Sequence, residues 1–398
     1  MIQDPFGWLG QLLHGWLVGL GMAPEWARAL QAFLAAGALA TAVLLLTFLL
    51  IWVERKLLAR LQDRLGPNRV GPYGIFQTIA DAIKLVLKEV IVPSGADRLV
   101  YFIAPPLAVM SVVGLWGVVP LAPNLIGSDI NVGVIYLVSI GSIGTLAVML
   151  AGWSSNNKYA LLGAFRTVAM LISYEVPMVV ALLVPTMLAG SMGTVEIVER
   201  QREIWFVVLA PIAALLFFIS SMAEAGKAPF DLLEAESEIV AGYNIEYSSM
   251  AFGMFFVGEF LHGFTIAALT VTLFFGGWLG PGVDRFPLLG LVYFALKTAV
   301  VYFGVVWIRG TLPRLRIDQV NAFNWKFLVP LSLATVAVTA VADKLGAGLG
   351  WNRILTLLGA NGVLALGTIL ALTIYARSVR RREDRLGAGR VTPATARG

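Results

Sequence analysis

The sequence predicts an all-α, polytopic membrane protein with about nine transmembrane helices and one interfacial amphipathic helix. Of its 398 residues, 58% are hydrophobic and 13% are charged, whereas soluble proteins carry about 25% charged residues. The mean hydropathy is +0.82. Many apolar stretches are long enough to cross roughly 30 Å of hydrocarbon as a helix. The alternating pattern of a membrane β-barrel is absent from the sequence.

The residue inventory limits the chemistry that the chain can perform by itself. It contains no cysteine and two histidines, His14 and His262, which lie in different segments. Without cysteine there are no disulfides, no iron–sulfur ligands and no thiol nucleophile. Haem ligation by a histidine pair within the chain is not expected either. Any redox cofactor is therefore expected on another polypeptide.

Residues 1–28 form the first of three predicted regions. They are rich in Gly and Trp, and Trp8, Trp16 and Trp26 favour a position at the membrane interface. A poorly hydrophobic extra span is the alternative interpretation, and a cleavable signal is not evident. A single transmembrane domain, 29–376, and a basic tail, 377–398, follow.

Nine apolar stretches in the transmembrane domain predict its spans. They lie at about residues 30–53, 101–121, 133–153, 167–190, 205–223, 251–279, 286–308, 327–345 and 354–376. Most Lys and Arg residues lie in the loops after odd-numbered spans and in the tail. The positive-inside rule then predicts that these loops and the C-terminus are cytoplasmic and that the N-terminus is outside.

The loop 54–100 after the first span is predicted to be functional. Gly66-Pro67 and Gly71-Pro72 exclude a continuous helix there. After Pro72, apolar residues recur at helical spacing from Ile75 to Val90, opposite Asp81, Lys84 and Lys88, which predicts an amphipathic helix at the interface. This helix either anchors the chain on lipid or packs beneath a soluble partner. The charges at 54–56 either end the span in water or line the mouth of a cavity.

Two carboxylates are predicted inside spans. Glu175 precedes Pro177 in the fourth span, and Glu259 lies one turn before His262 in the sixth. The proline frees backbone groups that neighbouring helices must satisfy. Charged residues within spans usually face a protein interior or a hydrated path and mark proton or ion routes. The alternative is a hydrogen-bonded packing contact. Because no third ligand is evident near Glu259 and His262, no metal site is expected.

The loop 224–250 is the second loop predicted to be functional. Between 223 and 247 it carries six carboxylates and one base, Lys227: the acids are Glu224, Asp231, Glu234, Glu236, Glu238 and Glu246. Closely spaced acids repel one another, which raises the proton affinity of at least one of them. A solvated acidic loop is the alternative, although the rigid, aromatic Ala228-Pro229-Phe230 turn is unusual in such a loop.

Four blocks of the sequence carry a resemblance to a known family: ERKLLARLQDRLGPNRVGPYGIFQTIADAIKLVLKE, GWSSNNKYALLGAFRTVAMLISYE, APFDLLEAESEIVAGYNIEYSSM and LRIDQVNAFNWKFLVPLSL. They resemble, in order, the signature blocks of the membrane H subunits of proton-translocating NADH:quinone oxidoreductase. This family is the bacterial counterpart of mitochondrial NADH dehydrogenase subunit 1 in respiratory complex I. The resemblance covers roughly residues 30–345.

This resemblance implies a translocase subunit of the bacterial plasma membrane that forms much of the chamber where quinone is reduced. It assigns one set of positions to the quinone passage: Glu54, Arg55, Arg64, Asn68, Arg69, Asp81, Lys84, Phe230 and Asp231. A second set forms a proton or coupling path: Glu175, Glu224, Glu234, Glu236, Glu238, Glu246 and Glu259. Quinone, ubiquinone or menaquinone, is the implied substrate, and reducing it consumes two protons.

The resemblance also implies partners. NADH, FMN and iron–sulfur clusters belong to partner subunits, among them the soluble quinone-site and iron–sulfur subunits of the hydrophilic arm. Antiporter-like and small membrane subunits and membrane lipid are the other implied partners, and nucleic acid is not one. The subunit itself is implied to carry no redox cofactor, and no catalytic residue is assigned with certainty.

The chain departs from the family pattern in several places. Many relatives have proline at the position of Leu233 and arginine at that of Lys227, so the resemblance does not determine the geometry of this loop. Some relatives have a buried glutamate in the third span, where this chain offers only Ser142. An acidic path is therefore expected through spans four to six. The ninth span and the tail are additions to the commoner eight-span pattern.

Two other functions are compatible with parts of this pattern. The homologous subunit of a membrane-bound hydrogenase-type complex would share the fold and carboxylates but need not bind quinone. A stand-alone ion transporter is a more distant alternative, and the inverted repeats typical of many transporters are not obvious in the sequence.

Overall fold

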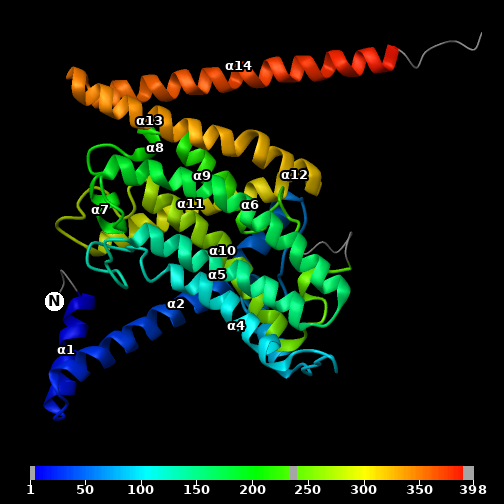
Figure 1. The fold of residues 1–398 in the computed structure, drawn as a ribbon. Coiled ribbons are helices and arrows are strands. Elements are labelled where there is room, and N and C mark those ends of the chain that lie inside the picture. The colour runs from blue at the N-terminus through cyan, green and yellow to red at the C-terminus, as the bar shows by residue number, and fades with distance from the viewer. Residues whose placement is uncertain (1–4, 234–239, 389–398) are drawn as a thin grey trace, which may run out of the picture.

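The computed structural model describes residues 5–233 and 240–388, and these residues form an α-helical bundle (Figure 1). No β-strand is present in these two ranges. Within the described part of the chain, eight helical segments are long and apolar enough to cross a membrane. The chain is therefore the all-α polytopic membrane protein that its composition predicts.

The helices are α1 (Pro5–Gly19), α2 (Pro24–Leu61), α3 (Gln77–Leu87), α4 (Arg98–Leu115), α5 (Gly133–Ser154), α6 (Lys158–Ala189), α7 (Thr194–Glu199), α8 (Phe206–Leu209), α9 (Pro211–Glu224), α10 (Ser249–Phe274), α11 (Leu288–Thr311), α12 (Ile317–Phe323), α13 (Val329–Leu349) and α14 (Arg353–Ala388).

Eight of the nine predicted spans correspond to these long segments, and the fifth is built differently. Instead of one helix over 205–223, the chain forms α8 and the shorter α9, which meet at Ala210. Pro211 has no N–H to donate, and Ala210 leaves the helical region with φ −138° and ψ 64°. Asn361 of α14 donates a 3.0 Å hydrogen bond to the Leu209 carbonyl at this break. The ninth span, α14, therefore packs where the fifth span is interrupted between α8 and α9.

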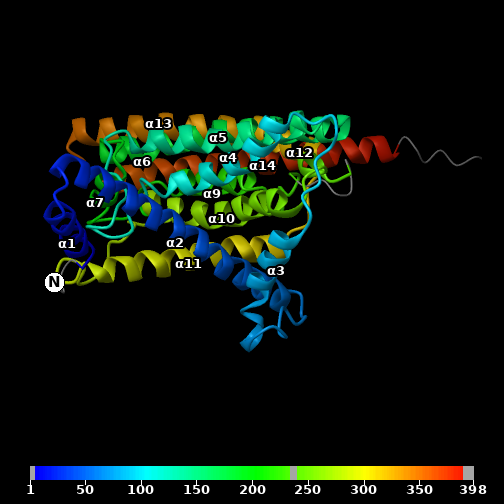
Figure 2. The same ribbon diagram turned by 90° about the horizontal axis from the view of Figure 1, so that it is seen from below.

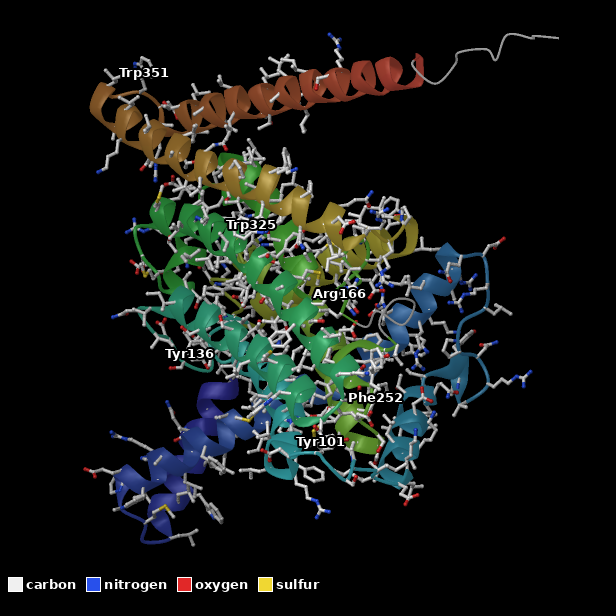
Figure 3. All side chains as sticks on the ribbon, turned by 45° about the vertical axis from the view of Figure 1, so that its right-hand side comes forward. Tyr101, Tyr136, Arg166, Phe252, Trp325 and Trp351 are labelled. Carbon is white, nitrogen blue, oxygen red and sulfur yellow. The ribbon has the colours of Figure 1, made fainter. Side chains whose placement is uncertain are left out.

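Helices α6 and α10 occupy the centre of the bundle, and α14 lies at its periphery. More than half of the apolar part of α6 and of α10 is buried, compared with 11% of that of α14. Figure 1 shows α14 along the outside of α13, on the side of the bundle away from α2. A smaller apolar cluster, which includes Tyr101 and has Phe252 packed against it, joins α4 to the start of α10 (Figure 3).

Lys297 lies inside the seventh span, and three backbone carbonyls surround its charge. Its ammonium donates hydrogen bonds of 2.9, 3.1 and 2.8 Å to the carbonyls of Phe275, Gly277 and Leu279, just beyond the end of α10. These carbonyls have no intrahelical donor, and the C-terminal end of a helix attracts cations. The Lys297 ammonium therefore satisfies the carbonyls that follow the C-terminal end of α10.

Helix α3 confirms the helix predicted after Pro72, although it is shorter than the apolar pattern. Asp81 faces α2, while Ile79, Ile83 and Val86 are exposed. In Figure 2, α3 lies at the end of α2 opposite α1. The interfacial position of α3 and that of residues 1–28 remain predictions.

Candidate functional site

A cavity of about 80 Å³ lies among α4, α5, α6, α9 and α10, and we call it the acidic cavity. Glu224 at the end of α9 lines it, together with Glu259 and His262 of α10 and Thr145 of α5. A buried water needs roughly 10–15 Å³ on this measure. The acidic cavity is therefore large enough for several waters between these side chains.

Glu175 adjoins this cavity through α5. Its carboxylate accepts a 3.2 Å hydrogen bond from the Thr145 hydroxyl, which itself lines the cavity. Helix α5 therefore contributes Thr145 to the acidic site, although the path was expected only in spans four to six. Ser142 of the same helix donates to the Val138 carbonyl.

The backbone next to Glu175 is held by a neighbouring helix, as Pro177 predicts. Proline removes the hydrogen bond that the carbonyl four residues earlier would accept. That carbonyl belongs to Ser173, and Asn324 donates to it at 2.6 Å. Asn324 begins a π-helical turn, Asn324–Leu328, between α12 and α13. The orientation of this part of α6 therefore depends on the eighth span.

Glu259, which is partly buried, forms an ion pair with the buried Lys227. The lysine ammonium donates to the Glu259 carboxylate at 2.9 Å, and only 2% of the lysine side chain is exposed. The ammonium also lies 4.7 Å from the centre of the Phe260 ring, in reach of a cation–π interaction. Lysine here makes a single hydrogen bond instead of a forked one.

A second cavity of about 30 Å³ adjoins the first. Glu224 and His262 line both cavities, but the remaining lining of the second is mostly apolar and includes Phe217, Ile266 and Leu273. Glu224 and His262 are therefore the titratable side chains that the two cavities share.

The segment 225–233 brings Phe230 into the bundle beside the cavity. Phe230 is buried, and its ring lies 5.3 Å from that of Tyr174 and 6.3 Å from that of Phe323. Asp231 next to it is half-buried. Glu234, Glu236 and Glu238 lie outside the described residues, so their assignment to the proton path remains a prediction.

Leu233 fits this segment because residue 226 is glycine. Gly226 has a φ of +61°, and a Cβ on it would lie 2.0 Å from Leu233 Cδ1. We predict that Gly226→Ala destabilises the protein by about 2 kcal/mol or more, through a positive φ on an L-residue and through overpacking. The thermal inactivation midpoint of the purified assembly measures this loss.

The double variant Gly226→Ala/Leu233→Ala separates the two causes. It removes the clash and keeps the positive φ, so we expect it to recover part of the midpoint lost in Gly226→Ala. Leu233→Ala alone is the control. A double variant no more stable than Gly226→Ala would show that the leucine contact is irrelevant.

Glu246 lies apart from the acidic cavity. Its carboxylate accepts a 2.6 Å hydrogen bond from Asn157, whose side-chain oxygen also accepts from the Tyr159 N–H at the start of α6. Its backbone carbonyl accepts from the Tyr101 hydroxyl at 2.7 Å. These contacts attach the loop before α10 to α4 and α6.

At the end of α2, Glu54 is buried and carries two partners from α11. Arg309 forms an ion pair with its carboxylate, and Tyr302 donates to it at 3.0 Å. The alternative in which the charges at 54–56 merely end the span in water is therefore wrong for Glu54, because 2% of its side chain is exposed.

Arg55 connects the same helix end to α3. Its guanidinium donates to the Asp81 carboxylate at 2.6 Å, and Gln77 donates to Asp81 at 3.1 Å. Burial raises the pKa of Asp81, but the hydrogen bonds from Arg55 and Gln77 and the nearby positive charges outweigh burial, so its pKa lies below the ordinary 3.8. The contact between α2 and α3 is thus charge-assisted.

A depressed pKa in the folded state sets the pH range in which this contact stabilises α3. The stabilisation is complete above the unfolded-state pKa and is lost as the pH falls through the lower folded-state value. We expect hydrogen exchange of α3, corrected for intrinsic rates, to be constant between about pH 8 and 5 and to rise only below about pH 4. Asp81→Asn should give faster exchange throughout, and an Asn variant identical to wild type would contradict this role.

The remaining residues assigned to the passage lie around the loop between α2 and α3. Gly74 has a φ of +75°, and a Cβ on it would lie 2.3 Å from the Pro67 carbonyl oxygen, so the loop closes on itself there. The other assigned side chains on this loop and on α3 are exposed: Arg64, Asn68, Arg69 and Lys84. Arg64 donates to Gln62 at 2.7 Å.

Sequence reasoning did not assign several residues that the fold brings to the site. Arg309 and Tyr302 reach Glu54 from the seventh span, Thr145 reaches Glu175 from the third, and Asn324 reaches the backbone of α6. Arg309 carried the one available signal, a charge at the end of an apolar stretch.

Comparison with known proteins places this site in a family. The family model described as NADH dehydrogenase matches residues 34–340. The NADH-quinone oxidoreductase H subunit of Dehalococcoides mccartyi (strain CBDB1) is 42% identical over 350 residues, which cover 88% of this chain and 94% of that protein. An NADH-quinone oxidoreductase H subunit of Rhodopseudomonas palustris (strain HaA2) is 45% identical over 309 residues, 76% of this chain and 95% of that protein. An H subunit of the same enzyme from Geobacter metallireducens (strain ATCC 53774 / DSM 7210 / GS-15) is 46% identical over 306 residues, 75% and 92% of the two chains. With its apolar helices, acidic cavity and these relatives, the chain belongs to the NADH dehydrogenase family as a homologue of the membrane H subunit of NADH-quinone oxidoreductase.

Proposed function

We propose that this chain forms the membrane wall of the quinone chamber and couples quinone reduction to proton movement through the acidic cavity. The observation that carries the proposal is the convergence of Glu224, Glu259 and His262 on one hydratable cavity inside the bundle. Charged groups inside a membrane domain are costly and rare, and those that face a hydrated cavity mark proton or ion paths.

The quinone end of this arrangement is the region between α2, α3 and the segment 225–233. Glu54 and Arg55 hold the end of α2 to α11 and α3, and Phe230 packs between α6 and the start of the eighth span. The basic and amide side chains of the loop 62–76 are exposed at the surface of the bundle. A soluble partner of the hydrophilic arm would bind there, on the predicted cytoplasmic side, and close the chamber.

The proton end begins at Glu224. Reduction of quinone takes up two protons, and a change of charge in the chamber alters the charge state of nearby carboxylates. Lys227 belongs to the chamber segment 225–233 and pairs with Glu259 of α10, so its charge interacts with both ends of the path. The path continues from Glu224 and Glu175 towards antiporter-like membrane subunits.

Photo-crosslinking of the assembled complex tests this function. A photoactivatable quinone is expected to label residues within 54–98 and 223–247, and iron–sulfur and flavin subunits are expected to co-purify in mild detergent. Labelling confined to other segments would overturn the chamber assignment. Co-purification of hydrogenase subunits in place of an NADH-oxidising flavoprotein would favour the hydrogenase-type alternative.

A further inference from the structure

A third cavity lies between α1 and the start of α2 and shares no lining residue with the acidic cavity. Its volume is about 500 Å³, and the loop that contains Asn124 closes one side. Figure 2 shows α1 at the end of the bundle opposite α3. The charge pattern predicts that this end faces outward. Apart from Asn124, the cavity is built from residues that precede the matched family region, 34–340.

Helix α1 presents two different faces. Gly7, Gly10, Gln11 and His14 recur at intervals of three and four residues and line the cavity. Trp8, Leu12 and Trp16 are exposed on the other side. A Cβ on Gly10 would lie 2.8 Å from the Gln31 side-chain nitrogen, so glycine there lets α2 approach closely. The face of α1 that carries Gln11 and His14 is thus turned towards α2.

The lining of this cavity has the chemistry of an anion site. Its polar side chains are one guanidinium, one imidazole and three amides, from Arg28, His14, Gln11, Gln31 and Asn124. No acidic side chain is among the described residues that line it. His14 Nδ1 is buried and has no hydrogen-bond partner within the ranges described. Guanidinium and amide donors are the groups that bind phosphate and carboxylate oxygens.

The surroundings favour a lipid headgroup over a free anion. Trp8 and Trp16 of α1 and Trp26 of α2 are exposed on the two helices that form the cavity, and exposed tryptophans mark the level of the headgroups in membrane proteins. The exposed Leu12 and Leu20 add apolar surface beside the same helix. We propose that the cavity between α1 and α2 binds the phosphodiester of an anionic phospholipid, with Arg28 on the phosphate and the acyl chains along the apolar face of α1.

Hydrogen exchange of the purified full complex tests this proposal, with delipidated complex titrated with phosphatidylglycerol micelles. We expect phosphatidylglycerol to protect residues 5–19. Arg28→Gln should need about tenfold more lipid for the same protection, the loss typical of one charge-assisted hydrogen bond. Arg28→Lys should recover part of it. Arg202→Gln is the matched control, because Arg202 is an exposed arginine in another loop predicted to be external.

The outcomes separate the possible ligands. Protection by sodium phosphate alone, equal to that by lipid, would assign the cavity to a free anion and overturn the lipid proposal. Equal protection in wild type and Arg28→Gln would show that α1 merely embeds in the micelle. If Arg28→Gln does not assemble, Gln11→Leu carries the same test. Quinone-linked turnover should stay unchanged in these variants, so the result is independent of the proposed chamber function.

Discussion

Lys227→Met is expected to destabilise the assembled protein more than any other single change at the site. The substitution leaves the Glu259 carboxylate in the bundle without its cation, 2.9 Å from where the ammonium lay. Breaking a buried ion pair from one side costs about 3–5 kcal/mol, because an uncompensated charge remains. The measurement is the thermal inactivation midpoint of the purified complex, together with the amount of complex that assembles.

A double-mutant cycle shows whether the pair itself is responsible. Lys227→Met/Glu259→Gln removes both charges, and we expect it to recover most of the stability lost in Lys227→Met. Lys227→Arg keeps the charge and should stay close to wild type. If the losses of the two single variants simply add in the double variant, the ion pair does not couple these residues.

Glu224→Gln is expected to abolish most quinone-linked turnover while leaving the complex assembled. Glu224 and His262 line both the acidic cavity and its apolar neighbour, so Glu224 is placed to pass a proton between them. Glutamine keeps the size of the side chain and cannot carry the proton. Groups that transfer protons typically contribute about 10²–10⁴ in rate. The assay is NADH-driven quinone reduction in proteoliposomes.

Glu246→Gln is the comparison for this variant: the resemblance assigns Glu246 to the path as well, but its carboxylate does not line the acidic cavity. It makes the same chemical change in the same loop, at a carboxylate bound to Asn157 outside the acidic cavity. We expect it to retain turnover. NADH oxidation by ferricyanide reports the soluble arm and should be unchanged in both variants. Equal turnover in Glu224→Gln and wild type would remove Glu224 from the proposed path.

The local sequence predicted most of the helices and their interruptions. Hydrophobic length determines the spans because lipid accepts only helices with internally satisfied backbones. Gly66-Pro67 and Gly71-Pro72 correctly end the helical pattern between α2 and α3. The prediction of one helix for the fifth span was wrong, because it rested on the continuous run of apolar residues and did not consider Pro211. The break between α8 and α9 lies directly before this proline.

The contacts of the charged residues could not be predicted from local sequence. Glu54 and Arg309 are separated by 255 positions, and Asn324 and Ser173 by 151. Composition indicates that a buried charge or a proline-freed carbonyl needs a partner. It does not name that partner, because helix packing decides which side chains meet.

The sequence by itself determined that this is a polytopic membrane protein with carboxylates placed inside its spans. Those properties follow from the transfer free energy of each segment, which depends on local composition. Only the tertiary structure decided that Glu224, Glu259 and His262 share a cavity while Glu246 fastens a loop. The physical reason is that burial, ion pairing and hydration depend on residues far apart in the chain, which only the packed bundle brings together.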